Sequence, residues 1–185
     1  MALDAPRAVR GAVAGTLAAA VWAAQQPLDQ RLFGVDYDDC ELLGRAFVRR
    51  SGRGPVGAWR PVGIALHLSN GALFGAAYAL ARPSIPLPSW ARGPAAGLSE
   101  GVATWPMTIV TDRVHPARAA MPRLWGNPAA FGQMLWRHTL FGVVLGEIER
   151  RLNPPVEPEE PVTEVVVSSN GHGRVEDLAP TASGG

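Results

Sequence analysis

The sequence contains no lysine and a single cysteine, and its positive and negative charges nearly cancel. All 17 basic residues are arginines, set against 16 acidic residues, for a formal net charge of +1. The lone Cys40 excludes an intramolecular disulfide and a cysteine-rich zinc site. A charge so close to neutral gives no support for nucleic-acid binding, and we expect no nucleic-acid partner.

Motifs of familiar enzyme chemistry are also missing from the chain. It has no Walker-type phosphate loop, no HExxH, no CxxC and no GxSxG nucleophile turn. His115, followed by Pro116 in a polar connection, is interpreted as a loop residue rather than a catalytic base. We therefore predict no catalytic residue, and the sequence favours a structural or binding protein over an enzyme.

Charged residues are absent from long stretches of the sequence. The segments 11–28 and 61–81 contain none, 93–111 contains only Glu100, and 128–148 carries Arg137 near its middle. About 20 helical residues cross the roughly 30 Å hydrocarbon core of a bilayer. The sequence therefore predicts an all-α fold with four transmembrane helices, at about 9–28, 61–82, 93–112 and 128–150.

A soluble bundle of buried helices is the alternative to a membrane protein. Buried helices of soluble proteins are usually shorter and keep a polar stripe. Tryptophans also precede the second, third and fourth stretches, at Trp59, Trp90 and Trp125, and tryptophan is typical of the membrane interface. These features favour a multi-pass protein of the cytoplasmic membrane. Six arginines on one side against nine on the other leave its orientation open.

Two segments lie outside the predicted spans. Residues 39–50 are predicted to form a short helix, with Leu43 and Phe47 on one face, that lies on the membrane surface or in solvent. From residue 153 the composition becomes acidic and rich in proline, so 153–185 is predicted to be a disordered tail that follows a transmembrane domain of residues 1–152.

The chain contains an apparent internal repeat. The motif H-x-x-x-G-x-x-x-G occurs at His67 and again, 71 residues later, at His138. The first and third stretches both begin with G-x-x-x-G, at Gly11 and at Gly93, an offset of 82. Two spans per unit keep both units in one orientation, so we predict two similar helical hairpins related as parallel repeats.

Glycines four residues apart are expected to hold these helices together. Small residues permit the close backbone approach on which helix association in lipid depends. The predicted packing positions are Gly11, Gly15, Gly71, Gly75, Gly93, Gly97, Gly101, Gly142 and Gly146.

Four ionisable residues lie at membrane depth in this scheme: His67, Glu100, Arg137 and His138. Because burial in lipid is costly, each needs a partner or water. A Glu100–Arg137 pair is one solution; the others are that Arg137 extends to the interface, or that Glu100 stays protonated. The sequence predicts a buried polar cluster of these four residues.

The two histidines leave three interpretations open. Both can be neutral packing residues that bond to a backbone carbonyl, Asn70 or Glu100. They can instead be the axial ligands of a b-type haem, or ligands of a metal together with Glu100. The packing interpretation is favoured, because a glycine-rich interface leaves little room for a macrocycle, so no cofactor and no metal is expected.

The pattern resembles small multi-pass inner-membrane proteins of unknown function from actinobacteria and other bacteria. The resemblance lies in the Gly11–Gly15 opening, Trp22, the acidic stretch 36–41 and the paired histidine–glycine helices. It implies an integral membrane protein and no particular activity. We expect a structural or interaction component whose partners are the bilayer and a protein or a second copy. The alternatives are a transporter or proton-relay protein that uses the polar cluster, and a bis-histidine haem redox protein.

Overall fold

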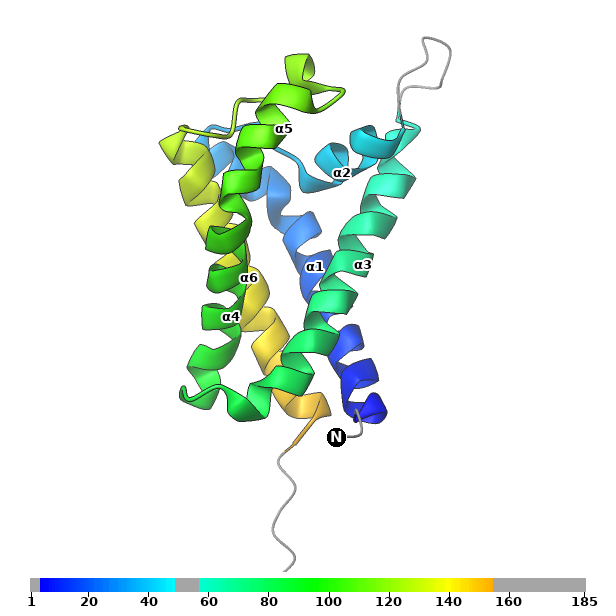
Figure 1. The fold of residues 1–185 in the computed structure, drawn as a ribbon, viewed down its shortest axis with the longest axis vertical. Coiled ribbons are helices and arrows are strands. Elements are labelled where there is room, and N and C mark those ends of the chain that lie inside the picture. Colours follow the sequence, from blue (N-terminus) through cyan, green and yellow to red (C-terminus); the bar gives the residue numbers. More distant parts are fainter. Residues whose placement is uncertain (1–3, 49–56, 155–185) are drawn as a thin grey trace, which may run out of the picture. The chain divides into compact units, whose positions relative to one another are not determined.

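The computed structural model describes residues 4–48 and 57–154, and in these residues every regular element is a helix. Four long helical segments run side by side (Figure 1). They are α1 (Ala5–Phe33), α3 (Trp59–Ala81), α4 (Ser89–Thr104) continued by α5 (Thr108–Val114), and α6 (Pro128–Leu152). The all-helical class expected from the sequence is confirmed. The predicted tail falls on residues 155–185, outside the described part.

The ends of the long helices follow local sequence rules. The side chain of Asp4 caps α1 by accepting from the Arg7 amide at 3.0 Å, and Gly34 ends that helix in the left-handed conformation, at φ 66°. The side chain of Asn127 caps α6 by accepting from the amides of Ala129 and Ala130. Each helix has proline in its first turn, where no intrahelical donor is needed.

The third segment, expected as one helix, is interrupted at a proline. Helix α4 ends at Thr104, a 3₁₀ turn covers Trp105–Met107, and α5 begins at Thr108. Pro106 lies inside that turn, and proline lacks the amide that a continuous helix would use there. The expected helix 93–112 is therefore two helices in sequence, the first of which begins earlier, at Ser89.

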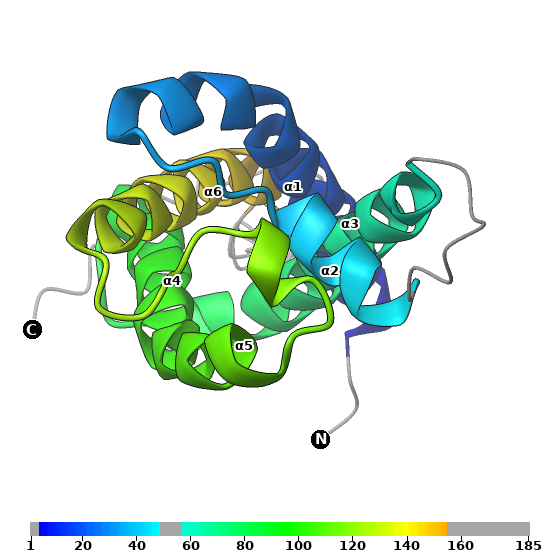
Figure 2. The same cartoon turned by 90° about the horizontal axis from the view of Figure 1, so that it is seen from above.

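Helices α1 and α6 form the centre of the arrangement. Seen from above, α3 lies against α1, and α4 lies against α6 (Figure 2). Small residues permit these contacts: a Cβ on Gly15 would overlap the carbonyl of Gly71, and one on Gly93 would overlap that of Gly142. The core between the helices consists of Ala14, Ala18, Ala19, Trp22, Tyr78, Phe141 and Leu145.

The short helix α2 (Asp39–Phe47) crosses one end of the bundle and packs against the start of α3. Cys40 and Gly44 are buried at this contact, and a Cβ on Gly44 would overlap the carbonyl of Trp59. The side of α2 that carries these two residues therefore packs on protein, while Phe47 is exposed. Residues 49 and 50 of the expected helix lie outside the described part.

One helix in the described residues is long and apolar enough to cross a membrane: Trp59–Ser84, 26 residues that comprise α3 and the 3₁₀ turn Arg82–Ser84.

Candidate functional site

Arg137, in the first half of α6, is the largest fully buried side chain in the described part of the chain. Its side chain has no solvent exposure, and it donates to Asp29 of α1 through Nε at 2.7 Å and Nη2 at 2.6 Å. A planar guanidinium and a carboxylate match in this two-point geometry. Arg137 also donates to Asp39 Oδ2 at 2.6 Å and to the Tyr37 carbonyl at 2.8 Å. One side chain thus joins α6, α1, the α1–α2 connection and α2.

Asp39, the first residue of α2, is held by three further groups. Its carboxylate accepts from the Trp22 indole N–H at 2.9 Å and from the Tyr37 hydroxyl at 2.6 Å. Its backbone amide donates to Gln26 Oε1 at 3.0 Å. The start of α2 is therefore bonded directly to two side chains of α1.

Asp29 is likewise satisfied from several sides. Besides Arg137, it accepts from Gln133 Nε2 at 2.7 Å and from Gln25 Nε2 at 2.6 Å. Gln133 Nε2 also reaches the Val35 carbonyl at 3.2 Å, whereas its Oε1 is buried without a partner in the described residues. With two carboxylates and one guanidinium, whose donors and acceptors are largely used internally, this group is suited to holding helices together rather than to chemistry.

Burial changes the acidity of two groups in the connection and in α2. The pKa of the Tyr37 hydroxyl lies well above its usual value of 10, first because the group is buried and then because Asp39 is close. Burial also raises the pKa of the Cys40 thiol, to about 11, and Asp38 and Asp39 add to the effect. Both side chains are therefore neutral at physiological pH, and Cys40 is a poor nucleophile there.

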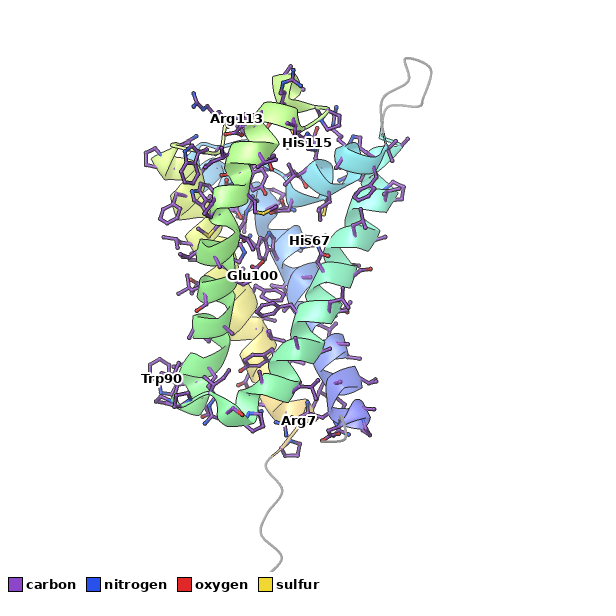
Figure 3. All side chains as sticks on the ribbon, viewed as in Figure 1. Arg7, His67, Trp90, Glu100, Arg113 and His115 are labelled. Atoms are coloured by element: carbon purple, nitrogen blue, oxygen red, sulfur yellow. The ribbon has the colours of Figure 1, made fainter. Side chains whose placement is uncertain are left out.

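A second polar site lies midway along the bundle, where Glu100 of α4 meets His138 of α6 (Figure 3). His138 Nδ1 lies 2.9 Å from the Met134 carbonyl, which can only accept, so this nitrogen carries a hydrogen. His138 Nε2 lies 2.8 Å from Glu100 Oε2. The imidazole nitrogen and the carboxylate oxygen therefore face each other at hydrogen-bond distance. The Glu100 side chain is 40% exposed, so the pair is open to the outside of the protein.

Gly101 positions His138 in this pair. A Cβ on Gly101 would come within 2.6 Å of His138 Cγ and 2.7 Å of Met134 Sδ. Such separations are far inside van der Waals contact, so a larger residue at 101 must displace the imidazole from Glu100.

Trp22 lies beside both repeat histidines. Its ring centroid is 5.5 Å from that of His67 and 4.6 Å from that of His138, both with edge-on geometry. His67 Nε2 donates to the Ala19 carbonyl at 3.1 Å. A haem with these two axial ligands would require the indole to leave its place and His67 to break this bond, so the residues present do not fit a haem. In the parts of the chain described, no three side chains of the metal-binding types are grouped to hold an ion.

A third polar cluster closes the opposite end of the bundle from α2. Glu149 of α6 has no solvent exposure and bonds to Arg82 at 2.5 Å and to Asn153 Nδ2 at 3.0 Å. Arg10 Nε in turn donates to Asn153 Oδ1 at 2.6 Å, and Arg7 Nε to the Ala79 carbonyl at 2.6 Å. The cluster joins the start of α1 to the ends of α3 and α6.

The four residues predicted as one polar cluster are thus divided between two sites. The Glu100–Arg137 pair considered from the sequence is not formed, because Arg137 is turned toward Asp29 and Asp39 and Glu100 bonds to His138. Nor does Arg137 extend to the interface, since it is enclosed. His67 and His138 are both near Trp22, on parallel helices.

Sequence reasoning missed most of the partners in these clusters. The first expected helix ended at residue 28 and left Asp29 out, although Trp22, Gln25, Gln26 and Asp29 follow the spacing of one helix face and so indicate a buried polar stripe. The pair Gln133 and Arg137, four residues apart on α6, carries the same signal. Asp39 and Glu149 had no such signal, because both lie in ordinary charged segments.

The chain was compared with protein-family models, curated proteins and solved structures, and no match was found in any of the three.

Proposed function

We propose that this chain is an integral membrane protein with four spans in two similar hairpins, acting as a structural or interaction component of a bacterial cytoplasmic membrane. The observation that carries the proposal is the distribution of polarity: charged side chains are enclosed between the helices, toward each end of the bundle, while many large apolar side chains are exposed on the outside. A protein dissolved in water has the opposite preference. The sequence resemblance to small multi-pass inner-membrane proteins is part of this proposal.

The interior supports a lipid environment. Arg137, Glu149 and Asp29 are at most 1% exposed, and the helices of the core approach each other closely at Ala14, Ala18 and Ala19. Interhelical polar bonds and small residues are the means by which helices associate in a bilayer, where no hydrophobic force drives them together.

The perimeter supports the same environment. On α1, the residues Val9, Val13, Leu17 and Val21 form an exposed stripe at four-residue spacing. Exposed apolar residues on the other long segments are Ile64, Leu73, Val102, Met107, Val110, Val114, Trp136 and Val143. Soluble monomers rarely leave apolar surface in so continuous a form. The uncharged part of α1 between Arg10 and Asp29 spans about 28 Å at the helical rise, close to the thickness of a hydrocarbon core.

The glycine contacts support two equivalent hairpins. Gly15 faces the Gly71 carbonyl and the Gly75 Cα, and Gly93 faces the Gly142 carbonyl and the Gly146 Cα in the same order. These contacts align Gly15 with Gly93, one helical turn away from the alignment of Gly11 with Gly93 that the sequence motif indicates. A duplicated hairpin whose first helix has shifted by a turn accounts for both.

A matched pair of substitutions tests the membrane assignment. Leu73, near the middle of α3, and Leu32, in the last turn of α1, are each 71% exposed. In water, arginine at either position changes stability by no more than about 0.5 kcal/mol. In a bilayer, Leu73→Arg costs about 2.5–3.5 kcal/mol, whereas Leu32→Arg costs much less because it lies near the interface.

We therefore expect the full-length protein to sediment with membranes, resist alkaline carbonate extraction and dissolve in detergent. Leu73→Arg should lower the inserted amount severalfold, and Leu32→Arg should leave it nearly unchanged. Equal tolerance of both substitutions, with wild-type protein in the detergent-free supernatant, would refute the proposal.

The Glu100–His138 pair favours a second candidate function, a proton relay. An imidazole nitrogen that lies 2.8 Å from the oxygen of a 40% exposed carboxylate is the donor–acceptor pair that such a relay needs. Vesicles that contain the protein and a pH-sensitive dye would show proton entry after an imposed pH difference. Glu100→Gln should abolish that entry, and Glu147→Gln, which changes an exposed carboxylate at the end of α6, should not. If vesicles with wild-type protein took up protons no faster than vesicles without protein, the relay would be refuted and the structural role would stand.

A further inference from the structure

A cavity of about 340 Å³ lies at the end of the bundle where α5 turns toward α6. Its wall consists of residues from α5, from the 3₁₀ turn Arg118–Ala120 and from the chain that leads to α6. Three arginines line it: Arg113, Arg118 and Arg123. Within the described ranges, none of their guanidinium groups has a hydrogen-bond or ion-pair partner. The side chain of Arg113 extends outward from α5 (Figure 3).

The other ionisable groups of the wall are already engaged. Asp112 accepts from the backbone amides of Leu124, at 3.1 Å, and Trp125, at 2.8 Å, so its carboxylate is directed at the chain and not at the arginines. His115 is 7% exposed; its Nε2 donates to the Leu42 carbonyl at 3.0 Å, and its Nδ1 accepts from the Ala117 amide at 3.2 Å. This imidazole is therefore neutral. The lining carries a formal charge of +2.

These same bonds hold the wall in shape. Asp112 ties the segment before α6 to α5, and His115 ties the end of α5 to α2. The arginines are thus carried on a fixed frame, with their charged ends free. Guanidinium groups in such an arrangement bind phosphate oxygens well, because their planar donors match two oxygens at once. The volume suits a headgroup-sized ligand.

An apolar surface adjoins the cavity. Met107, at the end of the 3₁₀ turn before α5, and Val110 and Val114 of α5 are exposed at helical spacing, and Trp125 in the wall is 37% exposed. An amphiphile with an anionic head could place its phosphate among the arginines and its chains along α5. A free phosphate ion would use the arginines alone.

We propose that this cavity is a binding site for the phosphate of an anionic phospholipid headgroup, formed by Arg113, Arg118 and Arg123. The choice of a lipid as the carrier of the phosphate rests on the proposed function, whereas the anion site itself rests on the cavity and its charges. In the bilayer, the site would attach one end of the bundle to anionic lipid.

The test uses full-length protein purified in a neutral detergent. Short-chain phosphatidylglycerol and phosphatidylcholine with the same acyl chains are added separately, and bound lipid is counted by native mass spectrometry. We expect phosphatidylglycerol to bind at least about tenfold more tightly. The double variant Arg118→Gln/Arg123→Gln should lose that preference. Arg31→Gln, which changes an exposed arginine at the same end of the bundle but outside the cavity, should keep it.

Further measurements separate the ways in which the proposal can fail. Equal binding of the two lipids, or an unchanged preference in the double variant, would refute the site. Displacement of phosphatidylglycerol by millimolar inorganic phosphate would refute the lipid as carrier and assign the cavity to a soluble anion. Thermal unfolding of each variant is measured alongside, and a preference lost without a change in melting temperature supports the site. Carbonate extraction of the wild type tests the membrane location independently of these results.

Discussion

Arg137 and Asp29 lie 108 positions apart in the chain, yet they meet through two hydrogen bonds of 2.7 and 2.6 Å with neither side chain exposed to solvent. The contact joins the two central helices, α1 and α6, at the end where α2 crosses the bundle. Removing one partner of a buried ion pair leaves the other charge uncompensated, which costs about 3–5 kcal/mol.

Arg137→Gln should therefore lower the melting temperature of the detergent-solubilised protein sharply. Where unfolding is reversible, the free energy of unfolding should fall by about 3–5 kcal/mol. Arg137→Lys should be intermediate, because lysine keeps the charge and loses the two-point geometry. Arg151→Gln is the control, since its pair with Glu147 is exposed and contributes at most about 1 kcal/mol. A loss no larger than that of the control would mean that Arg137 does not hold α1 and α6 together.

Gly15→Ala should separate α1 from α3. The added methyl would overlap the Gly71 carbonyl and come within 2.9 Å of the Gly75 Cα, both on the backbone, which cannot move aside as a side chain could. We expect a destabilisation of about 1–3 kcal/mol, the usual cost of overpacking. Ala20→Leu, at an exposed position of the same helix, adds more atoms and should change the melting temperature little. Equal melting temperatures of the two variants would show that the close contact at Gly15 does not hold α1 against α3.

Cys40 should react slowly with thiol reagents in folded protein. Because its pKa is raised to about 11, less of the reactive thiolate is present at every pH below that value than for a free cysteine, whose pKa is about 8.5. The rate of alkylation should rise about tenfold per pH unit from pH 7 to pH 10 without levelling off. In denatured protein it should level off near pH 9. A plateau near pH 9 in the folded state would contradict the buried position on α2.

Gly101→Val should disturb His138 without removing an ionisable group. The added carbons would force the imidazole away from Glu100. Nitrogen NMR of labelled histidines should therefore show the His138 Nε2 signal moving in the same direction in Gly101→Val as in Glu100→Gln. The His67 signal serves as the internal reference, because His67 bonds to the Ala19 carbonyl of α1 and neither substitution changes that bond. A wild-type His138 signal in Gly101→Val would show that Gly101 does not position the imidazole.

Much of the helical layout follows from local features of the sequence. The four charge-poor stretches coincide with the four long helical segments, because a helix satisfies the backbone groups of a long apolar stretch within the stretch itself. Pro106 accounts for the break before α5, and the glycines at four-residue spacing predicted which faces meet. These signals are local: each depends on residues within one or two turns of one another.

The polar partners could not be predicted in this way. In a simple hairpin of two straight helices, Glu100 and Arg137 would face each other, and for this reason the sequence suggests that they pair. However, α1 packs against α6 and brings Asp29 to the guanidinium, and α2 adds Asp39. Which helices pack at the centre of the bundle depends on the sum of many close contacts, and no single sequence motif predicts it.

The sequence by itself determined where the long helical segments lie and which of their faces are small enough to touch, because charge-free stretches and glycines act on their own neighbourhood. Only the tertiary structure decided that Arg137 is bound to Asp29 and Asp39, that Trp22 lies beside both histidines, and that three arginines surround one cavity. The physical reason is that a buried charge takes whichever partner the packed backbones bring within about 3 Å, and that proximity is set by the whole arrangement of helices.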